Sequence, residues 1–236
     1  MLARDWYYND RRQVGLDFSA EAQIATYDRR QADHPDRARA TLKSLGVVEG
    51  WTVADIGCGT GLMACEAADM GANVHAIDIS PAMLSMATLR AREAGVSLTT
   101  QSAGFLSFTY EANSFDLIIS EYALHHLPDF WKAVGLARVF NALKPGGLLF
   151  LRDVVFTSKP DGVERSVEQW SDFLLKNHGY SREEFAMHVR DQHSTFGWVI
   201  EGLLKEAGFV LESADYSAPV YGTYRARKPL ANGEGK

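Results

Sequence analysis

Residues 53–61 read Val53-Ala54-Asp55-Ile56-Gly57-Cys58-Gly59-Thr60-Gly61, and residues 74–78 read Val74-His75-Ala76-Ile77-Asp78. The first stretch is an apolar run followed by alternating glycines, which predicts a strand that turns sharply into a helix. The second is another apolar run that ends in an acid, about 20 residues after the glycines. Glycines let a ligand approach the N–H groups at a helix N-terminus, and a carboxylate at a strand end accepts hydrogen bonds from ribose hydroxyls. Together the two stretches predict a nucleoside site.

The spacing of the glycines separates two kinds of nucleoside site. A dinucleotide site has the pattern GxGxxG, whose last glycine allows close packing around a pyrophosphate. Here the pattern is GxGxG, and Leu62 stands where that last glycine would be. Asp55 places a carboxylate near the turn, which would repel a pyrophosphate but attract an ammonium group. The sequence therefore favours a nucleoside that carries an ammonium group and no phosphate.

Four further motifs follow the glycine turn. They are Asp78-Ile79-Ser80-Pro81-Ala82-Met83-Leu84, Ser114-Phe115-Asp116-Leu117-Ile118-Ile119-Ser120, Ala123-Leu124-His125-His126-Leu127-Pro128-Asp129 and Leu143-Lys144-Pro145-Gly146-Gly147. In these motifs and their order the chain resembles the class I S-adenosylmethionine-dependent methyltransferases, closely over residues 45–155 and more loosely beyond. The resemblance implies S-adenosyl-L-methionine as the cofactor. It also implies in-line transfer of its methyl group to an O, N, S or activated C atom of a small, partly apolar metabolite.

Alternating apolar runs and helical segments predict an α/β fold with a doubly wound, Rossmann-like and mostly parallel sheet. Strands are expected at 52–56, 73–77, 97–101, 115–119 and 147–153, and helices at 60–70, 81–94 and 130–143. The family supplies an antiparallel C-terminal edge strand, for which 208–211 and 221–227 are the candidates. Residues 1–236 would form one domain with a helical cap (1–45), a cofactor-binding core (46–156), a helical insertion (157–206), a closing hairpin (207–230) and a tail (231–236).

The cofactor contacts are expected at the ends of the first four strands and at one N-terminal tyrosine. The candidates are Tyr27, Asp55, Gly57, Gly59, Gly61, Asp78, Ile79, Met83, Ser102, Gly104, Phe105 and Ser120. Asp78 would bind the ribose, and Ile79 and Met83 would line the adenine. Two alternatives stay open, because Asp55 could orient the glycine loop without touching the ligand and Tyr27 could belong to the core.

The third strand departs from the family pattern. In the family it usually ends in an acid that contacts the adenine amino group, but residues 102–106 read Ser102-Ala103-Gly104-Phe105-Leu106 and contain none. Recognition of the adenine would then rest on the Ser102 hydroxyl or on backbone groups, with Phe105 stacked nearby.

The candidates for the chemical step follow the fourth strand. A base is needed only if the acceptor still holds a proton, and Glu121 and His125 are the candidates for catalysis. Tyr122, Asp153 and Tyr221 are the candidates for substrate contact. For His125 a structural role is the favoured alternative, since Leu-His-His-Leu occurs in relatives with very different acceptors. The histidines and acids of residues 178–193 are expected on solvated helix faces, so no metal site is predicted.

Composition limits the partners. The 236 residues carry a formal net charge of −6, and no dense block of Lys and Arg is present, which argues against a nucleic-acid partner. No segment has the apolar length of a transmembrane helix, and residues 1–10 lack the apolar core of a signal peptide. The two cysteines, Cys58 and Cys65, have no metal-ligand spacing. We expect a cytoplasmic protein that acts as a monomer or homodimer on a small-molecule methyl acceptor.

Two rival functions remain open. An NAD-dependent oxidoreductase could use a related sheet, although the glycine spacing and Leu62 argue against it. A catalytically silent module that binds S-adenosylmethionine and a protein partner would have the same binding residues, because binding and turnover are separable.

Overall fold

The computed structural model describes residues 5–12, 35–216 and 220–230. The strands are β1 (Thr52–Ile56), β2 (Asn73–Asp78), β3 (Thr99–Ser102), β4 (Phe115–Glu121), β5 (Leu143–Phe156), β6 (Thr195–Phe196), β7 (Val210–Tyr216) and β8 (Tyr221–Arg227). The helices are α2 (Pro35–Ser44), α3 (Leu62–Asp69), α4 (Pro81–Ala94), η1 (Leu124–His126), α5 (Asp129–Ala142), η2 (Pro160–Gly162), α6 (Val163–Asn177), α7 (Arg182–Asp191) and α8 (Gly197–Glu206).

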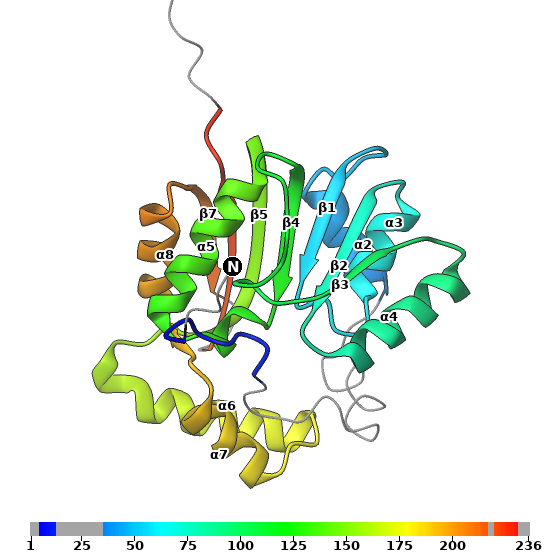
Figure 1. Cartoon of the computed structure of the whole chain (residues 1–236). Helices are drawn as coiled ribbons and strands as arrows, with labels where there is room; N and C mark the ends of the chain where they lie inside the picture. The colour runs from blue at the N-terminus through cyan, green and yellow to red at the C-terminus, as the bar shows by residue number, and fades with distance from the viewer. Residues whose placement is uncertain (1–4, 13–34, 217–219, 231–236) are drawn as a thin grey trace, which may run out of the picture.

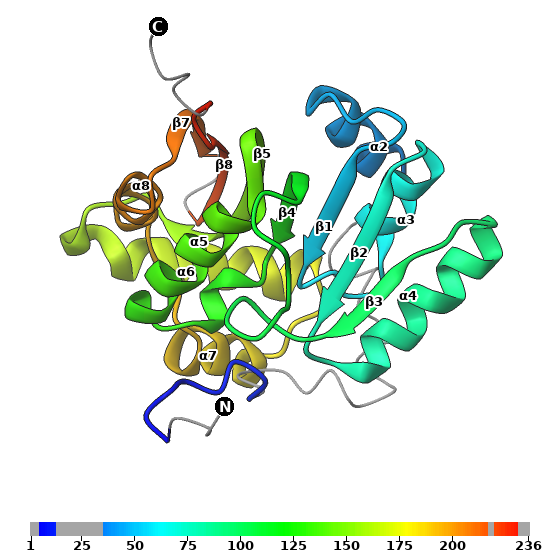
Figure 2. The same ribbon diagram turned by 45° about the horizontal axis from the view of Figure 1, so that its top comes forward.

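The strands form one twisted sheet with the order β3-β2-β1-β4-β5-β8-β7 (Figures 1 and 2). The short strand β6 pairs with the end of β5. Strands β1 to β5 are parallel to one another, whereas β8 runs antiparallel to both β5 and β7. The expected doubly wound, mostly parallel sheet is therefore confirmed, with the antiparallel strand one place in from the edge. The strand order reverses between β1 and β4, and ligands of such sheets bind at that point, beyond the carboxyl ends of the strands.

Helices cover both faces of the sheet because neighbouring strand residues point to opposite sides. Ile118 belongs to the core under α5 and α8, while the adjacent Leu117 belongs to the core under α2, α3 and α4. Figure 2 shows these two helical layers on either side of the strands. Both β4 residues are fully buried, which explains why these strands are continuous apolar runs rather than alternating ones.

The expected elements agree closely with the structure near the glycine turn. β1 and α4 have the expected bounds, and α4 has the expected caps: Ser80 Oγ accepts from Met83 N (3.3 Å), and Gly95 is left-handed (φ 71°). β5 is longer than expected and starts at Leu143, because Leu143 already pairs with Phe115 before a shift in the register.

Two parts of the N-terminal region pack at different places in the fold. Residues 5–12, here called the N-terminal strap, lie at the end of the sheet to which the parallel strands point (Figures 1 and 2). α2, in contrast, buries Ala38 and Leu42 in the core beside α3 and does not cover the strand ends. Residues 13–34, with the candidate Tyr27, lie outside the described residues.

The region expected to be a helical insertion contains two kinds of helix. α6 and α7 pack with the end of β5 around Trp170, Leu174 and Phe185. α8 instead buries Ile200 and Leu204 in the core that it shares with α5, so it belongs to a helical layer of the sheet. The subdivision of residues 1–236 stays a prediction. None of the helices in the described ranges has the length and apolar character needed to cross a membrane.

Gly61→Ala should destabilise the fold more than Gly95→Ala, although both glycines are left-handed (φ 81° and 71°). A Cβ on Gly61 would lie 2.6 Å from the Cβ of Ala87 in α4, whereas a Cβ on Gly95 would meet nothing within 4 Å. In both variants the free energy of unfolding should fall by roughly 1–2 kcal/mol, because alanine is strained in the left-handed conformation. Gly61→Ala should lose about 1–3 kcal/mol more through overpacking of α3 against α4. Urea unfolding measures both losses, and equal losses would contradict this explanation.

Candidate functional site

A cavity of about 300 Å³ lies at the carboxyl ends of β1, β2 and β4, where the strand order reverses. Its wall contains residues from the glycine turn, the β2–α4 turn, the segment after β3, the segment after β4 and the N-terminal strap. They are Asp10, Arg11, Ile56, Gly57, Gly59, Asp78, Ile79, Ser80, Pro81, Met83, Ala103, Gly104, Phe105, Tyr122, Ala123, His126 and Leu127.

Asp78 is the buried acid of this cavity, and its carboxylate is held by two backbone donors. Gly59 N donates to Oδ2 (2.9 Å), and Ser80 N donates to Oδ1 (2.8 Å). Burial raises the pKa of Asp78, while the backbone N–H groups of Ser80, Gly59 and Ile79 act in the opposite direction. Each carboxylate oxygen has a second lone pair to offer. Asp78 can therefore accept hydrogen bonds from two neighbouring hydroxyls, as a ribose would provide them.

The glycine turn lies close to the segment after β4. Gly57 has a left-handed φ of 77°, and a Cβ at this position would overlap the Cβ of Ala123. Gly57 N and Cys58 N both donate to the carbonyl oxygen of Ile77 (2.7 and 3.0 Å), which ties the turn to β2. Gly57 and Gly59 line the cavity, whereas the wall does not include Gly61, which packs against α4.

The apolar wall consists largely of residues expected from the sequence. Ile79, Met83, Gly104 and Phe105 all line the cavity, and Phe105 and Met83 are buried. Ser102 is not in the wall, and its carbonyl oxygen accepts from an Arg11 guanidinium nitrogen (2.8 Å). This side of the cavity can hold a flat aromatic base.

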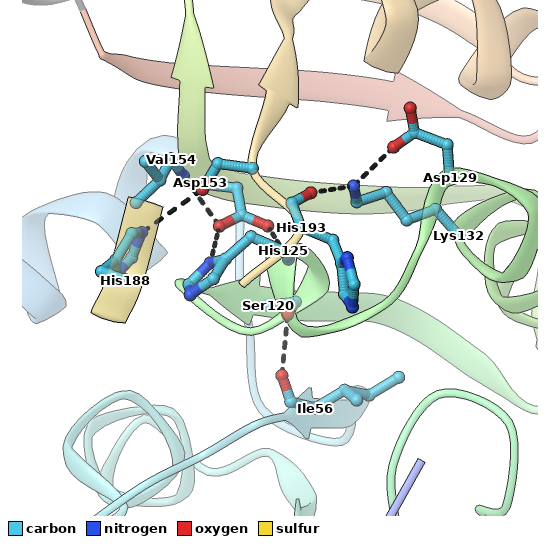
Figure 3. A network of polar contacts seen from close by, with 10 residues as sticks. Ile56, Ser120, His125, Asp129, Lys132, Asp153, Val154, His188 and His193 are labelled. Atoms are coloured by element: carbon cyan, nitrogen blue, oxygen red, sulfur yellow. Dashed lines mark hydrogen bonds and ion pairs between the residues drawn. The ribbon is translucent and has the colours of Figure 1, made fainter. Parts of the chain in front are cut away.

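Two expected cofactor residues are buried behind the wall. Ser120 Oγ donates to the carbonyl oxygen of Ile56 (2.7 Å), so it joins β4 to β1 (Figure 3). Asp55 is 3% exposed and lies beneath the turn; burial, then the Asp55 carboxylate and then Asp78, raise the pKa of the Cys58 thiol. This position agrees with the alternative in which Asp55 supports the loop.

The segment after β4 presents Tyr122 and His126 to the cavity. Tyr122 has a left-handed φ of 55°, which is uncommon for a bulky residue and marks a held conformation. Burial, followed by the Glu121 carboxylate, raises the pKa of the Tyr122 phenol to about 12. Its ring meets Tyr221 edge to face (5.9 Å), and the Tyr221 hydroxyl accepts from Trp170 Nε1 (3.0 Å).

The three remaining candidates pair with one another or with a neighbour. His125 Nδ1 lies 2.5 Å from Asp153 Oδ1, and His125 N donates to Asp153 Oδ2 (2.8 Å), with both side chains buried (Figure 3). Glu121 forms an ion pair with Arg152, its partner residue across β4 and β5. Glu121, His125 and Asp153 do not line the cavity.

Sequence reasoning missed four polar residues of the wall, of which Ser80 had been expected only as the N-cap of α4. Asp10 and Arg11 come from the strap, and no spacing in the sequence links the strap to residues 102–107. His126 follows His125 directly, and the short 3-10 helix η1 decides which of the two faces the cavity. The described residues contain no group of three or more His, Cys, Asp and Glu side chains placed to hold a metal ion.

Known proteins are similar to this chain in sequence and in fold. A family model described as "Methyltransferase domain" matches residues 53–147. The ubiquinone biosynthesis O-methyltransferase of Xanthomonas axonopodis pv. citri (strain 306) is 30% identical over 185 residues, which are 78% of this chain and 72% of that protein. Phosphoethanolamine N-methyltransferase 2 of Caenorhabditis elegans is 39% identical over 129 residues, but the match spans 53% of this chain and 29% of that protein.

A solved structure of magnesium protoporphyrin IX methyltransferase from Synechocystis PCC 6803, with bound SAH, has a TM-score of 0.62 and 19% identity. The match covers 93% of this chain and 91% of that one. The chain belongs to the class I S-adenosylmethionine-dependent methyltransferases. Its expected fold, enzyme class, cofactor and small-molecule type of methyl transfer are thereby confirmed.

His188 of α7 packs beside the site, so the expectation that it lies on a solvated helix face is wrong. Its ring lies 5.0 Å from His125 and 4.7 Å from Trp170, and its Nε2 is 3.3 Å from Ser194 Oγ. Burial, and then the nearby His125 and His126, lower the pKa of His188 to about 2. The imidazole is therefore in its neutral form in the folded protein at neutral pH.

Replacing His188 with Phe should make stability less sensitive to acid. The pKa of His188 is lowered on folding, so the unfolded chain binds a proton below about pH 6.5 that the folded chain does not. Its contribution is therefore present above that pH and lost as the pH falls. Between pH 7 and 5 the loss amounts to about 2 kcal/mol.

Urea unfolding of the wild type and His188→Phe at both pH values measures the difference. His75 and His193, whose pKa values are also lowered by burial, leave part of the acid sensitivity in the variant. If the free energy of unfolding fell by the same amount in both proteins between pH 7 and 5, the buried, neutral state of His188 would be contradicted.

Proposed function

We propose that the cavity binds S-adenosylmethionine and that the protein methylates an oxygen atom of a small, partly apolar molecule. The observation that carries the cofactor site is the Asp78 carboxylate, held by Gly59 N and Ser80 N and directed at a cavity that glycines border. An anion with spare lone pairs, fixed by two backbone donors, is complementary to the two hydroxyls of a ribose.

The other groups of the cofactor follow from the position of the ribose. Ile79, Met83 and Phe105 supply an apolar wall for the adenine on one side of Asp78. Gly57 and Gly59 leave room for the amino-acid portion on the other side, near the buried carboxylate of Asp55. Tyr122, Ala123, His126 and Leu127 then remain for the acceptor.

The bound cofactor supplies an electrophilic methyl group on a sulfonium, so the chain has to orient the acceptor, keep water away and remove a proton where one is present. His126 is the only histidine that lines the cavity among the described residues. An imidazole has a pKa suited to taking a proton from a phenol or an acid. We assign His126 the role of base, and Tyr122 and Tyr221 the wall around the acceptor.

Two observations support oxygen as the acceptor atom. The Xanthomonas relative that matches over most of both chains is named as an O-methyltransferase. The acceptor side also has a mixed character, because the Tyr122 ring and Leu127 give apolar contact while His126 is polar. A phenol or an aromatic acid fits this mixture.

His125 and Glu121, in contrast, are proposed as positioning residues. The His125–Asp153 pair fixes η1 and the end of β5, and the Glu121–Arg152 pair fixes the segment that carries Tyr122. Asp153 accepts from His125 and from Val154 N (2.8 Å), so it is occupied with the backbone. This replaces the earlier expectation that Asp153 contacts the substrate.

We further propose a cytoplasmic location and a monomeric or homodimeric state, on the basis of the acidic composition and the absence of a long apolar segment. Cell fractionation and sedimentation test these two points separately from the activity.

Asp78→Asn should weaken binding of S-adenosylhomocysteine at least tenfold. An amide keeps the size of the side chain but offers one acceptor oxygen, so a hydrogen bond to a charged group worth about 1.5–3 kcal/mol is lost. Titration calorimetry measures the affinity. Asp116→Asn is the matched control, because Asp116 also accepts from a backbone donor, Thr52 N (2.8 Å), at the opposite ends of the strands. Equal affinity in wild type and a folded Asp78→Asn would overturn the ribose assignment.

His126→Gln should reduce turnover by about 10²–10⁴ and leave the affinity for S-adenosylhomocysteine almost unchanged, because it removes a base that cofactor binding does not use. His125→Gln should lower the melting temperature and weaken binding and turnover together, since it leaves the buried Asp153 carboxylate without its imidazole partner. Release of S-adenosylhomocysteine with a panel of small phenols and aromatic acids measures turnover.

The opposite pattern is also informative. A stable His125→Gln protein with normal cofactor affinity and no turnover, beside an active His126→Gln, would exchange the two roles. No turnover by the wild type with any acceptor, despite tight cofactor binding, would favour the catalytically silent module.

A further inference from the structure

The N-terminal strap carries an acid into the wall of the cavity. Asp10 Oδ2 accepts from Leu106 N (2.7 Å) and Ser107 N (3.1 Å), in the stretch 103–107 that follows β3 and contains no acid of its own. The close approach of Asp10 to residue 104 requires a glycine there, because a Cβ on Gly104 would lie 2.6 Å from Asp10 Oδ2. Among the residues that the structure describes, Asp10 and Asp78 are the two acids that line the cavity.

Further contacts fix the strap in this position. Arg11 donates to the carbonyl oxygen of Ser102 (2.8 Å), and the ring of Tyr7 meets that of Trp131 edge to face at 4.8 Å. Tyr8 lies 6.0 Å from the same ring. Asp10 is thus anchored on both sides within the strap, and its carboxylate is held before any ligand binds.

We propose that Asp10 binds the 6-amino group of the adenine and selects adenine over other bases. The proposal rests on the cofactor site proposed above, which places the ribose on Asp78 and the base against Ile79, Met83 and Phe105. A Cβ built on Gly104 would touch both Asp10 Oδ2 (2.6 Å) and Ile79 Cγ2 (3.2 Å). The carboxylate therefore lies beside the apolar wall that would hold the base. Both backbone bonds go to Oδ2, so Oδ1 retains its capacity to accept from an amino group.

Asp10 lies 96 residues before Leu106 in the sequence, so its bond to Leu106 N attaches the strap to the segment after β3. A ligand that binds Asp10 also holds the strap over the cavity. The strap therefore takes a direct part in cofactor recognition.

The test uses two ligands of the same charge: S-adenosylhomocysteine and an analogue that carries hydrogen in place of the 6-amino group. The wild type should bind S-adenosylhomocysteine about 10- to 100-fold more tightly than the analogue, the effect of one hydrogen bond to a charged group. In Asp10→Asn the amide oxygen has to serve Leu106 N and Ser107 N, so the NH₂ group faces the adenine. The ratio of the two affinities should then fall to about one or below.

Gly104→Ala gives an independent route to the same result, since its Cβ displaces the carboxylate without removing the charge. The ratio of its affinities for S-adenosylhomocysteine and for the analogue should also approach one. Asp5→Asn is the matched control in the same strap, because Asp5 is exposed and does not line the cavity, and its ratio should equal that of the wild type.

The outcomes separate the two proposals. An unchanged preference for the amino group in folded Asp10→Asn and Gly104→Ala would overturn the role of Asp10, even if both variants bind more weakly overall. Failure of the wild type to bind either ligand would instead overturn the cofactor site itself.

Discussion

Asp78 joins the three loops that form the cofactor side of the cavity. Its carboxylate accepts from Gly59 N in the turn after β1 and from Ser80 N in the turn after β2, while its carbonyl oxygen accepts from Ala103 N after β3 (3.0 Å). A buried carboxylate is costly unless donors surround it, and these backbone N–H groups offset that cost. The charge that would recognise the ribose therefore also fixes the loops around it.

The acceptor side depends on a separate set of polar pairs. The Glu121–Arg152 and His125–Asp153 pairs hold the segment after β4, and the carbonyl oxygen of His125 accepts from His193 N (2.8 Å). The buried Lys132 ammonium bridges Asp129 and the carbonyl oxygen of His193 (Figure 3). The segment after α7 is thereby attached to η1, which carries His126.

The parts of the fold and site that could be predicted are those set by local patterns. The glycine spacing and the apolar runs placed Gly57, Gly59, Asp78, Ile79 and Met83 correctly in one wall, because parallel strands end at the same edge. Contacts between distant segments could not be found in this way. Asp10 reaches Leu106 through the packing of the strap, and the choice between His125 and His126 depends on the rotation of one short 3-10 helix.

A crystal structure with S-adenosylhomocysteine would test the account most directly, through the distances from the ribose oxygens to the Asp78 carboxylate. Both ribose hydroxyls should lie within hydrogen-bond distance of Asp78, with Gly59 N and Ser80 N still bound to it and the adenine between Met83 and Phe105. A ligand whose ribose lies elsewhere in the cavity, or an Asp78 carboxylate that keeps only its backbone partners, would contradict it.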